Sequence, residues 1–289
     1  MISMTRITLL VLPLLLAMVP VCACAEGPAP GAALVTVETR DFKAMFSEKA
    51  AWTLYEISYK GTVVCGHNGF YGAVLIPKGG KFIGTGHTDG GQEQVEKVEL
   101  TVDGVKRPLT DKADYKGHKI VLKKNSMIDK LKHAATIEIT NDQIREHHDF
   151  TATEDEAMHL MYAFMHPWVP TTKYWIGMPL QGGELLRGEF ANDKGFKMRA
   201  DVRWTAVYDP TNKNGMVAAY PKPVAGKLHK NAYWDQPHYH KLYFQTFSDD
   251  TVKAGTTWDY EIVLRGFESA EKDWEKTAAS AAAKVSQQR

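Results

Sequence analysis

The sequence has few cysteines and almost no net charge. Its 289 residues include 3 cysteines, and 35 Lys and Arg residues stand against 34 Asp and Glu residues, a formal charge of +1. No block of Lys and Arg residues occurs, which argues against a dedicated nucleic-acid binder, because such proteins neutralise phosphates with a concentrated basic surface. The three cysteines are too few for a disulfide framework, so the fold is expected to depend on a packed core.

Several catalytic motifs are also missing from the sequence. It contains no Gly-x-Ser-x-Gly elbow, no His-Glu-x-x-His helix motif and no Cys-x-x-Cys pair. The readings as serine hydrolase, zincin and thioredoxin-like protein therefore lack their motifs. Beyond a short N-terminal leader, the sequence shows no linker, low-complexity tract or fixed-period repeat.

The first 25 residues resemble an export signal. Residues 1–6 carry one positive charge, residues 7–21 are uncharged, and Ala23-x-Ala25 is a small-residue cleavage site. We expect cleavage after Ala25, residues 26–33 as a flexible leader, and a periplasmic or secreted protein. A membrane anchor is disfavoured, because the apolar run is short and contains two prolines. Lipidation of Cys24 is the alternative that would keep the mature chain on a membrane. Cys65 then remains as a single thiol, expected to be buried and unreactive.

The body of the chain has the pattern of an all-β protein. Segments rich in aromatic and β-branched residues recur at short spacing, separated by Gly, Pro, Asn and Asp, which favours stacked antiparallel sheets. Asp103-Gly104 is a strong hairpin signal after an alternating segment. We expect a large antiparallel β-sandwich over residues 34–268 and a peripheral helix or tail over 269–289. The expected strands are Leu34–Glu38, Trp52–Tyr59, Thr62–Cys65, Phe70–Ile76, Val95–Val102, Ala134–Thr140, Glu184–Phe190, Phe196–Tyr208, Tyr239–Phe247 and Thr256–Leu264.

One segment fits two interpretations. Residues 154–165 could begin as a helix at a capping box, Thr153-x-x-Glu156, or could form a central strand with two apolar faces. The all-β context favours the strand.

Histidine is the most informative residue type, because its pKa near ~6.5 lets it accept or donate a proton at neutral pH. His87 and Asp89 lie among glycines in residues 84–93, and we expect a base with its orienting carboxylate. The alternative is an exposed glycine-rich hairpin. His147 and His148 would point to opposite faces of a strand, so we expect a solvated turn there.

Two aromatic segments have the composition of a sugar site. His166-Pro-Trp168 is followed by Trp175, and aromatic rings stack on the apolar face of a pyranose. The alternative is that these rings belong to the core. In residues 233–243, His238 and His240 share one strand face, while three further residues share the other face: Tyr239, Lys241 and Tyr243.

His-x-His on a strand is also a metal-ligand spacing, so a divalent metal at His238 and His240 is an alternative. No Glu follows shortly after the pair, as a cupin site would require, and we expect no cofactor. Arg187 lies between apolar neighbours and is the expected partner of a sugar carboxylate, because Arg offers a bidentate fork.

The chain resembles galactose-mutarotase-like β-supersandwich proteins. The resemblance is carried by residues 68–80, where a strand ends at Pro77 before Gly79-Gly80, and by residues 203–210 and 257–267. It implies a supersandwich-like fold and a carbohydrate partner. Proteins of this fold include polysaccharide lyases and sugar-binding domains, and fold does not choose among them.

The most concrete expectation is an exported polysaccharide lyase acting by β-elimination on a uronate-containing glycan. The alternatives are a non-catalytic glycan-binding module, a sugar epimerase or glycoside hydrolase, and a His-dependent metal site. The catalytic candidates are His87, His240, Tyr239, Tyr243 and Arg187. The substrate-binding candidates are Asp89, His166, Trp168, Trp175, Trp234, His238 and Lys241.

Overall fold

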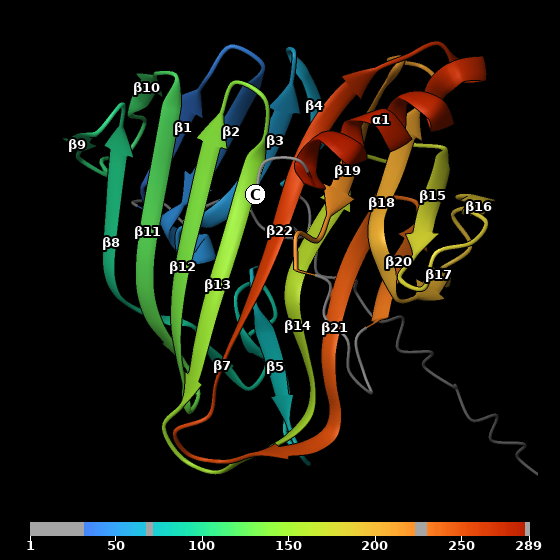
Figure 1. Cartoon of the computed structure of the whole chain (residues 1–289). Helices are drawn as coiled ribbons and strands as arrows, with labels where there is room; N and C mark the ends of the chain where they lie inside the picture. The colour runs from blue at the N-terminus through green and yellow to red at the C-terminus, as the bar shows by residue number, and fades with distance from the viewer. Residues whose placement is uncertain (1–31, 68–71, 223–229, 287–289) are drawn as a thin grey trace, which may run out of the picture.

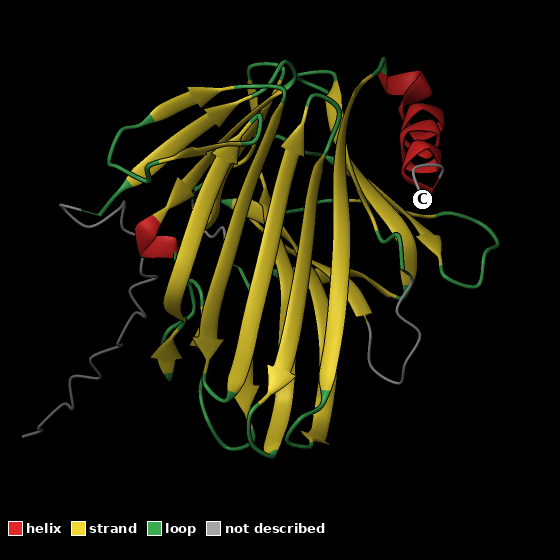
Figure 2. Ribbon diagram, turned by 60° about the vertical axis from the view of Figure 1, so that its left-hand side comes forward, coloured by secondary structure: helices red, strands yellow, loops and turns green. Residues whose placement is uncertain are grey.

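The protein folds as two large facing β-sheets with one helix on the outside, in a computed structural model that describes residues 32–67, 72–222 and 230–286 (Figures 1 and 2). Of the neighbouring strand pairs in these residues, β1–β10 and β6–β7 run parallel and the others antiparallel. The expected all-β sandwich with a C-terminal helix is confirmed.

The first sheet has twelve strands within the described residues, nine of them in one continuous order. That order is β10 (Asp114–Lys116), β1 (Leu34–Glu38), β2 (Phe42–Ser47), β3 (Thr53–Tyr59), β4 (Thr62–Cys65), β14 (Glu156–Trp168), β21 (Tyr239–Val252), β20 (Lys230–Gln236) and β17 (Gly195–Ala200). Beside β14 lie β5 (Val74–Pro77), β6 (Ile83–Gly84) and β7 (Gly91–Gln92).

The second sheet has ten strands in the same part of the chain. Their order is β16 (Leu186–Glu189), β15 (Tyr174–Pro179), β18 (Val202–Asp209), β19 (Asn214–Ala219), β22 (Thr257–Glu268), β13 (Ile144–Ala152), β12 (Leu131–Thr140), β11 (Lys119–Ile128), β8 (Gln94–Val102) and β9 (Val105–Arg107). Short helical turns occupy Glu48–Ala50 (η1) and Glu271–Asp273 (η2), and α1 spans Trp274–Ser286.

Local sequence signals explain several of these elements. The β8–β9 hairpin turns at Asp103 and Gly104, whose φ angles of 49° and 80° suit a tight hairpin. Glu156–Trp168 is a strand, as its context predicted, and pairs with β21 along its length. Cys65 is buried, and burial raises the pKa of its thiol well above the ordinary value, as expected for an unreactive cysteine.

Two expectations about elements were wrong. Residues 196–208 form two strands in different sheets, because β17 ends at Ala200 and β18 begins at Val202 in the other sheet. His147 and His148 lie in β13 rather than in a solvated turn, although they do point to opposite faces. The expected peripheral C-terminal helix is present as α1, which packs on the outside of the second sheet.

The contact between α1 and the sheet has a simple origin in the helical repeat. Trp274, Ala278, Ala282 and Val285 recur at helical spacing and are all buried. They pack on outward-facing residues of β18, β19 and β22 and form a second, smaller apolar cluster outside the main core. The main core lies between the two sheets, where both contribute buried side chains.

The inner face of the second sheet also carries ionisable residues. β11, β12 and β13 alternate between inward and outward side chains, and some inward positions are polar. Lys124, Ser126, His133, Glu146 and His148 are all buried there. Buried charges and imidazoles need hydrogen-bond or ion-pair partners, so these side chains form a connected polar network.

Candidate functional site

Strand β21 presents different chemistry on its two faces. Leu242 faces the core and shares its face with His240, while Tyr239, Lys241 and Tyr243 lie on the opposite, outer face. Lys241 Nζ lies 4.5 Å from the ring centroid of Tyr239 and 5.6 Å from that of Tyr243. Its side chain is enclosed, and burial lowers the pKa of Lys241 well below its usual value.

The glycine-rich loop brings His87 to the same face. Its imidazole stacks on Phe82 with ring centroids 4.7 Å apart. Burial and the nearby charge of Lys241 lower the pKa of His87 to about 4, against a smaller opposing effect of Asp89. His87 is therefore a neutral imidazole at pH 7 and can accept a proton. Asp89 itself is exposed.

Six rings form a continuous line across the outer face of the first sheet, which we call the aromatic track. Successive ring centroids along it are 4.7, 6.5, 4.5, 6.4 and 4.8 Å apart. In order, the rings are His87, Phe82, Tyr162, Tyr243, Phe196 and Trp234. The elements involved are far apart in sequence, and only the pairing of β14, β21, β20 and β17 assembles them.

The track carries an exposed cation. The Arg199 guanidinium carbon lies 5.1 Å from the ring centroid of Phe196, and Arg199 also acts electrostatically on Tyr162. Phe196 is 45% exposed, which is unusual for a large apolar side chain. An exposed guanidinium beside open aromatic faces can bind an anionic group on a stacked ring.

Sequence reasoning missed four members of this face: Phe82, Tyr162, Phe196 and Arg199. In the sequence, Arg199 stands two residues before Asp201 and so shares its strand parity, a spacing that favours surface pairing of the two over substrate binding. Phe196 follows a glycine and belongs to no motif. The pairing of Phe196 with Trp234 depends on the tertiary register.

His240 lies inside the sandwich. Its ring stacks on Phe190 with centroids 4.0 Å apart, and its Nδ1 lies 3.0 Å from Asp235 Oδ1. Burial lowers the pKa of His240, and Asp235 opposes that shift. His240 therefore cannot work with Tyr239 or Tyr243 on one substrate, because they occupy opposite faces of β21. This corrects the expected pairing of His240 as base with a tyrosine acid.

The two histidines of the His-x-His segment do not form a common site. His238 is exposed at the turn between β20 and β21, whereas His240 is buried. Within the residues that the structure describes, no group of three or more His, Cys, Asp or Glu side chains is arranged to hold a metal ion.

Four further candidates lie away from the track. His166 Nε2 contacts Glu146 Oε1 at 2.7 Å inside the core, and Trp168 and Trp175 are 1% and 9% exposed. Of the three expected stacking tryptophans, Trp234 is therefore the one on the track. Arg187 pairs with Glu275 of α1 at 3.0 Å, on an edge strand of the other sheet, so it cannot clamp a carboxylate held on the track.

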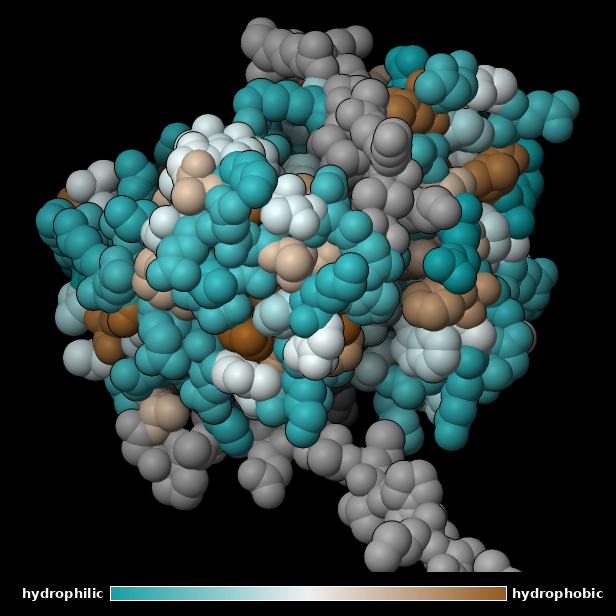
Figure 3. Space-filling model, turned by 90° about the horizontal axis from the view of Figure 1, so that it is seen from below, coloured by the Kyte–Doolittle hydropathy of each residue, from teal (hydrophilic) through white to brown (hydrophobic). Residues whose placement is uncertain are grey.

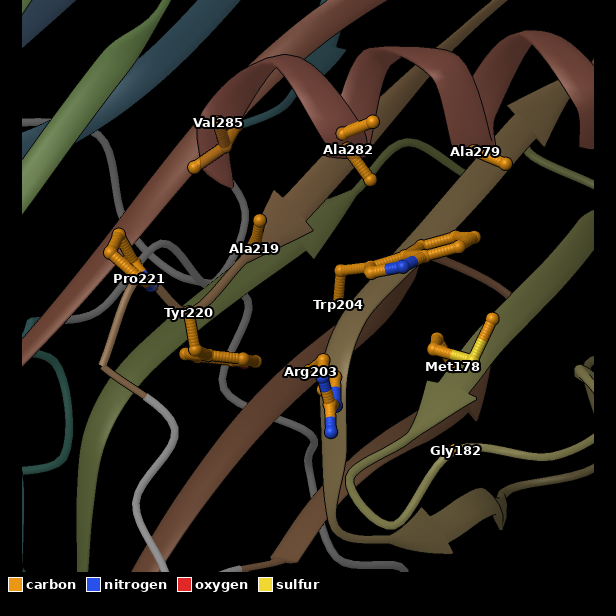
Figure 4. Close-up of a pocket in the computed structure, with 11 residues that line it drawn as sticks. Met178, Gly182, Arg203, Trp204, Ala219, Tyr220, Pro221, Ala279, Ala282 and Val285 are labelled. Carbon is orange, nitrogen blue, oxygen red and sulfur yellow. The ribbon is translucent and has the colours of Figure 1, made fainter. Parts of the chain in front are cut away.

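A separate groove of about 610 Å³ lies between α1 and strands β18 and β19 (Figure 4). Arg203, Trp204 and Met178 line it from the sheet, and Ala279, Ala282 and Val285 line it from the helix. No histidine or carboxylate is among its lining residues, so it lacks the acid–base groups found on the track.

Comparison with known proteins finds similar structures but no sequence family. No protein-family model matches the sequence, and no curated protein matches it. The galactosidase domain of the α-galactosidase–sucrose kinase AgaSK is 9% identical, with a TM-score of 0.53, and the match covers 84% of this chain and 42% of that one.

The fold of this chain is similar to that of the AgaSK galactosidase domain. Two further similar structures are a putative aldose 1-epimerase from Escherichia coli K12 and a galactose mutarotase-like protein from Lactobacillus casei ATCC 334. They are 10% and 12% identical, each with a TM-score of 0.48, and the matches cover 82% and 81% of this chain and 100% of each of theirs. Identities this low concern fold rather than activity.

The expected export signal falls in residues 1–25, which lie outside the described residues. Among the helices that the structure describes, none has the length and apolar character needed to span a membrane. Viewed from below, the surface is largely hydrophilic, with separate hydrophobic residues (Figure 3).

Proposed function

We propose that this protein is an exported carbohydrate-active enzyme whose site is the aromatic track, and that it acts as a polysaccharide lyase on a uronate-containing glycan. One observation carries the proposal. An exposed guanidinium, Arg199, and a neutral imidazole, His87, belong to the same line of rings on one sheet face. Sugar stacking, carboxylate binding and proton abstraction are the three functions that a uronate lyase combines.

The proposed reaction is a β-elimination. Arg199 binds the carboxylate of a uronate further along the glycan and so holds the chain on the track, while at the other end of the track the proton on C5 of the reacting uronate is removed. His87 accepts that proton, the C5 electron pair forms the C4–C5 double bond, and the C4–O bond to the leaving sugar breaks. Tyr243 donates a proton to the departing oxygen. The products are an unsaturated uronate and a sugar with a free hydroxyl group, and no oxidant is consumed.

Lys241 supports this chemistry from beneath the track. It is enclosed between two tyrosines, so it does not bind substrate directly as the sequence suggested. Burial is the main cause of the low pKa of His87, and the charge of Lys241 lowers that pKa further. When an anionic substrate arrives, the added negative charge favours the ammonium form of Lys241.

The test uses the chain from Glu26 onward and a panel of uronate-containing and neutral polysaccharides. Ultraviolet absorbance follows the new unsaturated uronate, and a reducing-end assay runs alongside. We expect absorbance growth on a uronate polymer, at least a hundredfold weaker in His87→Ala and unchanged in Arg187→Ala. Reducing ends without absorbance would indicate hydrolysis, and silence of both signals on every polymer would reject the lyase.

A non-catalytic glycan-binding module is the second candidate, and the length of the aromatic track favours it. Six consecutive rings suit an extended sugar chain whether or not a bond is broken. On this proposal, Trp234→Ala and Phe196→Ala each weaken retention in a glycan affinity gel several-fold, while His87→Gln retains binding. Equal retention by the wild type and both aromatic variants would contradict any role for the track.

A further inference from the structure

The loop that carries His87 is closed at its base by one carboxylate. Thr85 Oγ1 donates a hydrogen bond to Glu93 Oε2, and the Glu93 amide donates to the Gly84 carbonyl at 3.2 Å. Gly84 has φ 143°, and a Cβ there would lie 2.4 Å from the Ala73 carbonyl oxygen. The two ends of the loop are thus tied to each other and pressed onto β5.

The same carboxylate is held by the other sheet. Glu93 Oε1 lies 2.8 Å from Lys124 Nζ, 2.6 Å from Ser126 Oγ and 3.0 Å from His133 Nδ1. All four side chains are almost fully buried. Burial would raise the pKa of Glu93, but Lys124 and His133 hold it well below its ordinary value. Glu93 therefore joins the loop of the first sheet to β11 and β12 of the second.

The loop is not closely packed on the side that faces the turn after η1. A groove of about 520 Å³ separates it from the turn after η1 and is lined by Trp52, Thr85, Gly86, Thr88 and Glu93, among others. Lys124 Nζ also donates to the Ala51 carbonyl at 2.8 Å, which fixes the far wall of this groove. Since space lies behind the loop, its position depends on the bonds at its base together with the β6–β7 pairing of Ile83 with Gly91 and of Gly84 with Gln92.

The orientation of Glu93 is reinforced by a chain of imidazoles. When His133 Nδ1–H donates to Glu93, its Nε2 is left as an acceptor. His148 Nδ1 lies 3.2 Å from that nitrogen and is the donor. Burial lowers the pKa of His133 and His148, so both rings are neutral in this arrangement. Outer-shell contacts of this kind fix the direction of the groups they support.

We propose that Glu93 is a positioning residue: through Thr85 it holds the loop so that His87 stays against Phe82 at the end of the aromatic track. The part played by His87 in catalysis rests on the proposed function, whereas the position of the loop does not. Glu93 touches no substrate in this scheme and acts only through the loop.

Thr85→Val tests the proposal, because valine has the shape of threonine but lacks the hydroxyl group, and the Glu93–Lys124 pair is left intact. We expect amide hydrogen exchange in residues 85–92 to accelerate at least tenfold, with β11 and β12 unchanged. Thr85→Ser restores protection, and Thr88→Val, at an exposed hydroxyl on the same loop, leaves exchange as in the wild type.

Glu93→Gln is the second variant, and it should release the loop as well as weaken the Lys124 contact. On a glycan that the wild type cleaves, Thr85→Val is expected to lower kcat about tenfold with little change in KM, since the rings that bind sugar stay in place. Unchanged loop exchange in Thr85→Val would overturn the positioning role. The two proposals can fail separately. If the wild type cleaves no glycan, the lyase is rejected; if loop exchange is nevertheless faster in Thr85→Val, the positioning role of Glu93 stands.

Discussion

At the scale of single residues, neighbouring positions in this chain differ in role because the pleat sends them to different environments. Tyr239 and Lys241 face outward beneath and beside the aromatic track, while His240 between them stacks on Phe190 in the interior. His147 and His148 divide in the same way, with His148 joined to the buried network and His147 among surface carboxylates. The histidines in the sequence therefore indicated acid–base chemistry but did not show where in the fold it would lie.

The fall of kcat/KM at low pH, its acid limb, tests whether His87 is the general base. Its pKa is about 4, lowered by burial and by Lys241, and a general base works only when unprotonated. We expect kcat/KM of the wild type to fall as pH drops through about 4, rather than through the ordinary histidine value near ~6.5.

Lys241→Met removes the positive charge while keeping much of the side-chain volume. The acid limb of kcat/KM should then move upward in pH, because one of the causes that lower the pKa of His87 is lost. A limb that stays fixed in Lys241→Met would show that Lys241 does not act on the base.

At the scale of elements, α1 is an added layer rather than part of the sandwich. Its apolar side meets outward-facing residues of β18, β19 and β22, and Tyr208 stacks on Trp274 with ring centroids 5.3 Å apart. Arg187 is part of this contact through Glu275. Arg187, which the sequence suggested as the partner of a sugar carboxylate, thus helps to hold α1 on the sheet.

Trp274→Ala should weaken this docking strongly. Removing a buried tryptophan leaves a cavity against Tyr208 and Phe267, and such truncations cost roughly 3–5 kcal/mol. We expect that loss in the free energy of unfolding measured in urea, with Lys284→Ala, at an exposed position of the same helix, close to the wild type. A Trp274→Ala protein as stable as the wild type would mean that α1 contributes little to the fold.

At the scale of the whole molecule, the buried polar row makes stability depend on pH. Burial lowers the native pKa values of His133 and His148 below the ordinary 6.5, and Lys124 and His133 hold that of Glu93 below the ordinary 4.5. As pH falls below the ordinary values, which apply to the unfolded chain, the unfolded chain takes up protons that the native protein does not bind. Stability is therefore full above about pH 6.5 and declines below it, at about 1.4 kcal/mol per pH unit for each such proton.

Urea unfolding at pH 7 and pH 5 checks this dependence. The free energy of unfolding should be clearly lower at pH 5, and the difference should shrink in His148→Gln, which removes one titrating group. His147→Gln, on the exposed face of the same strand, serves as the control and should keep the full difference. Equal stability at the two pH values would contradict neutral buried imidazoles.

Much of the architecture could be predicted from the sequence, because strand alternation and hairpin signals are local. The Asp103-Gly104 turn, the strand at Glu156–Trp168 and the opposite faces of β21 follow from residues close to one another in the chain. The break between β17 and β18 could not be foreseen, because it depends on the strands with which each half pairs, β20 for β17 and β15 and β19 for β18, rather than on local propensity.

What the sequence by itself determined is the set of side chains that share each strand face, since the two-residue repeat of a strand is a property of the backbone. The tertiary structure decided which face turns outward and which strands become neighbours. That choice placed His87, Tyr243 and Arg199 on one open surface, and enclosed His240, His166 and Trp168 in the core. The physical reason is that the outward face of a strand is fixed by its pairing with distant strands and by the burial of most apolar side chains. Neither is encoded within any one segment.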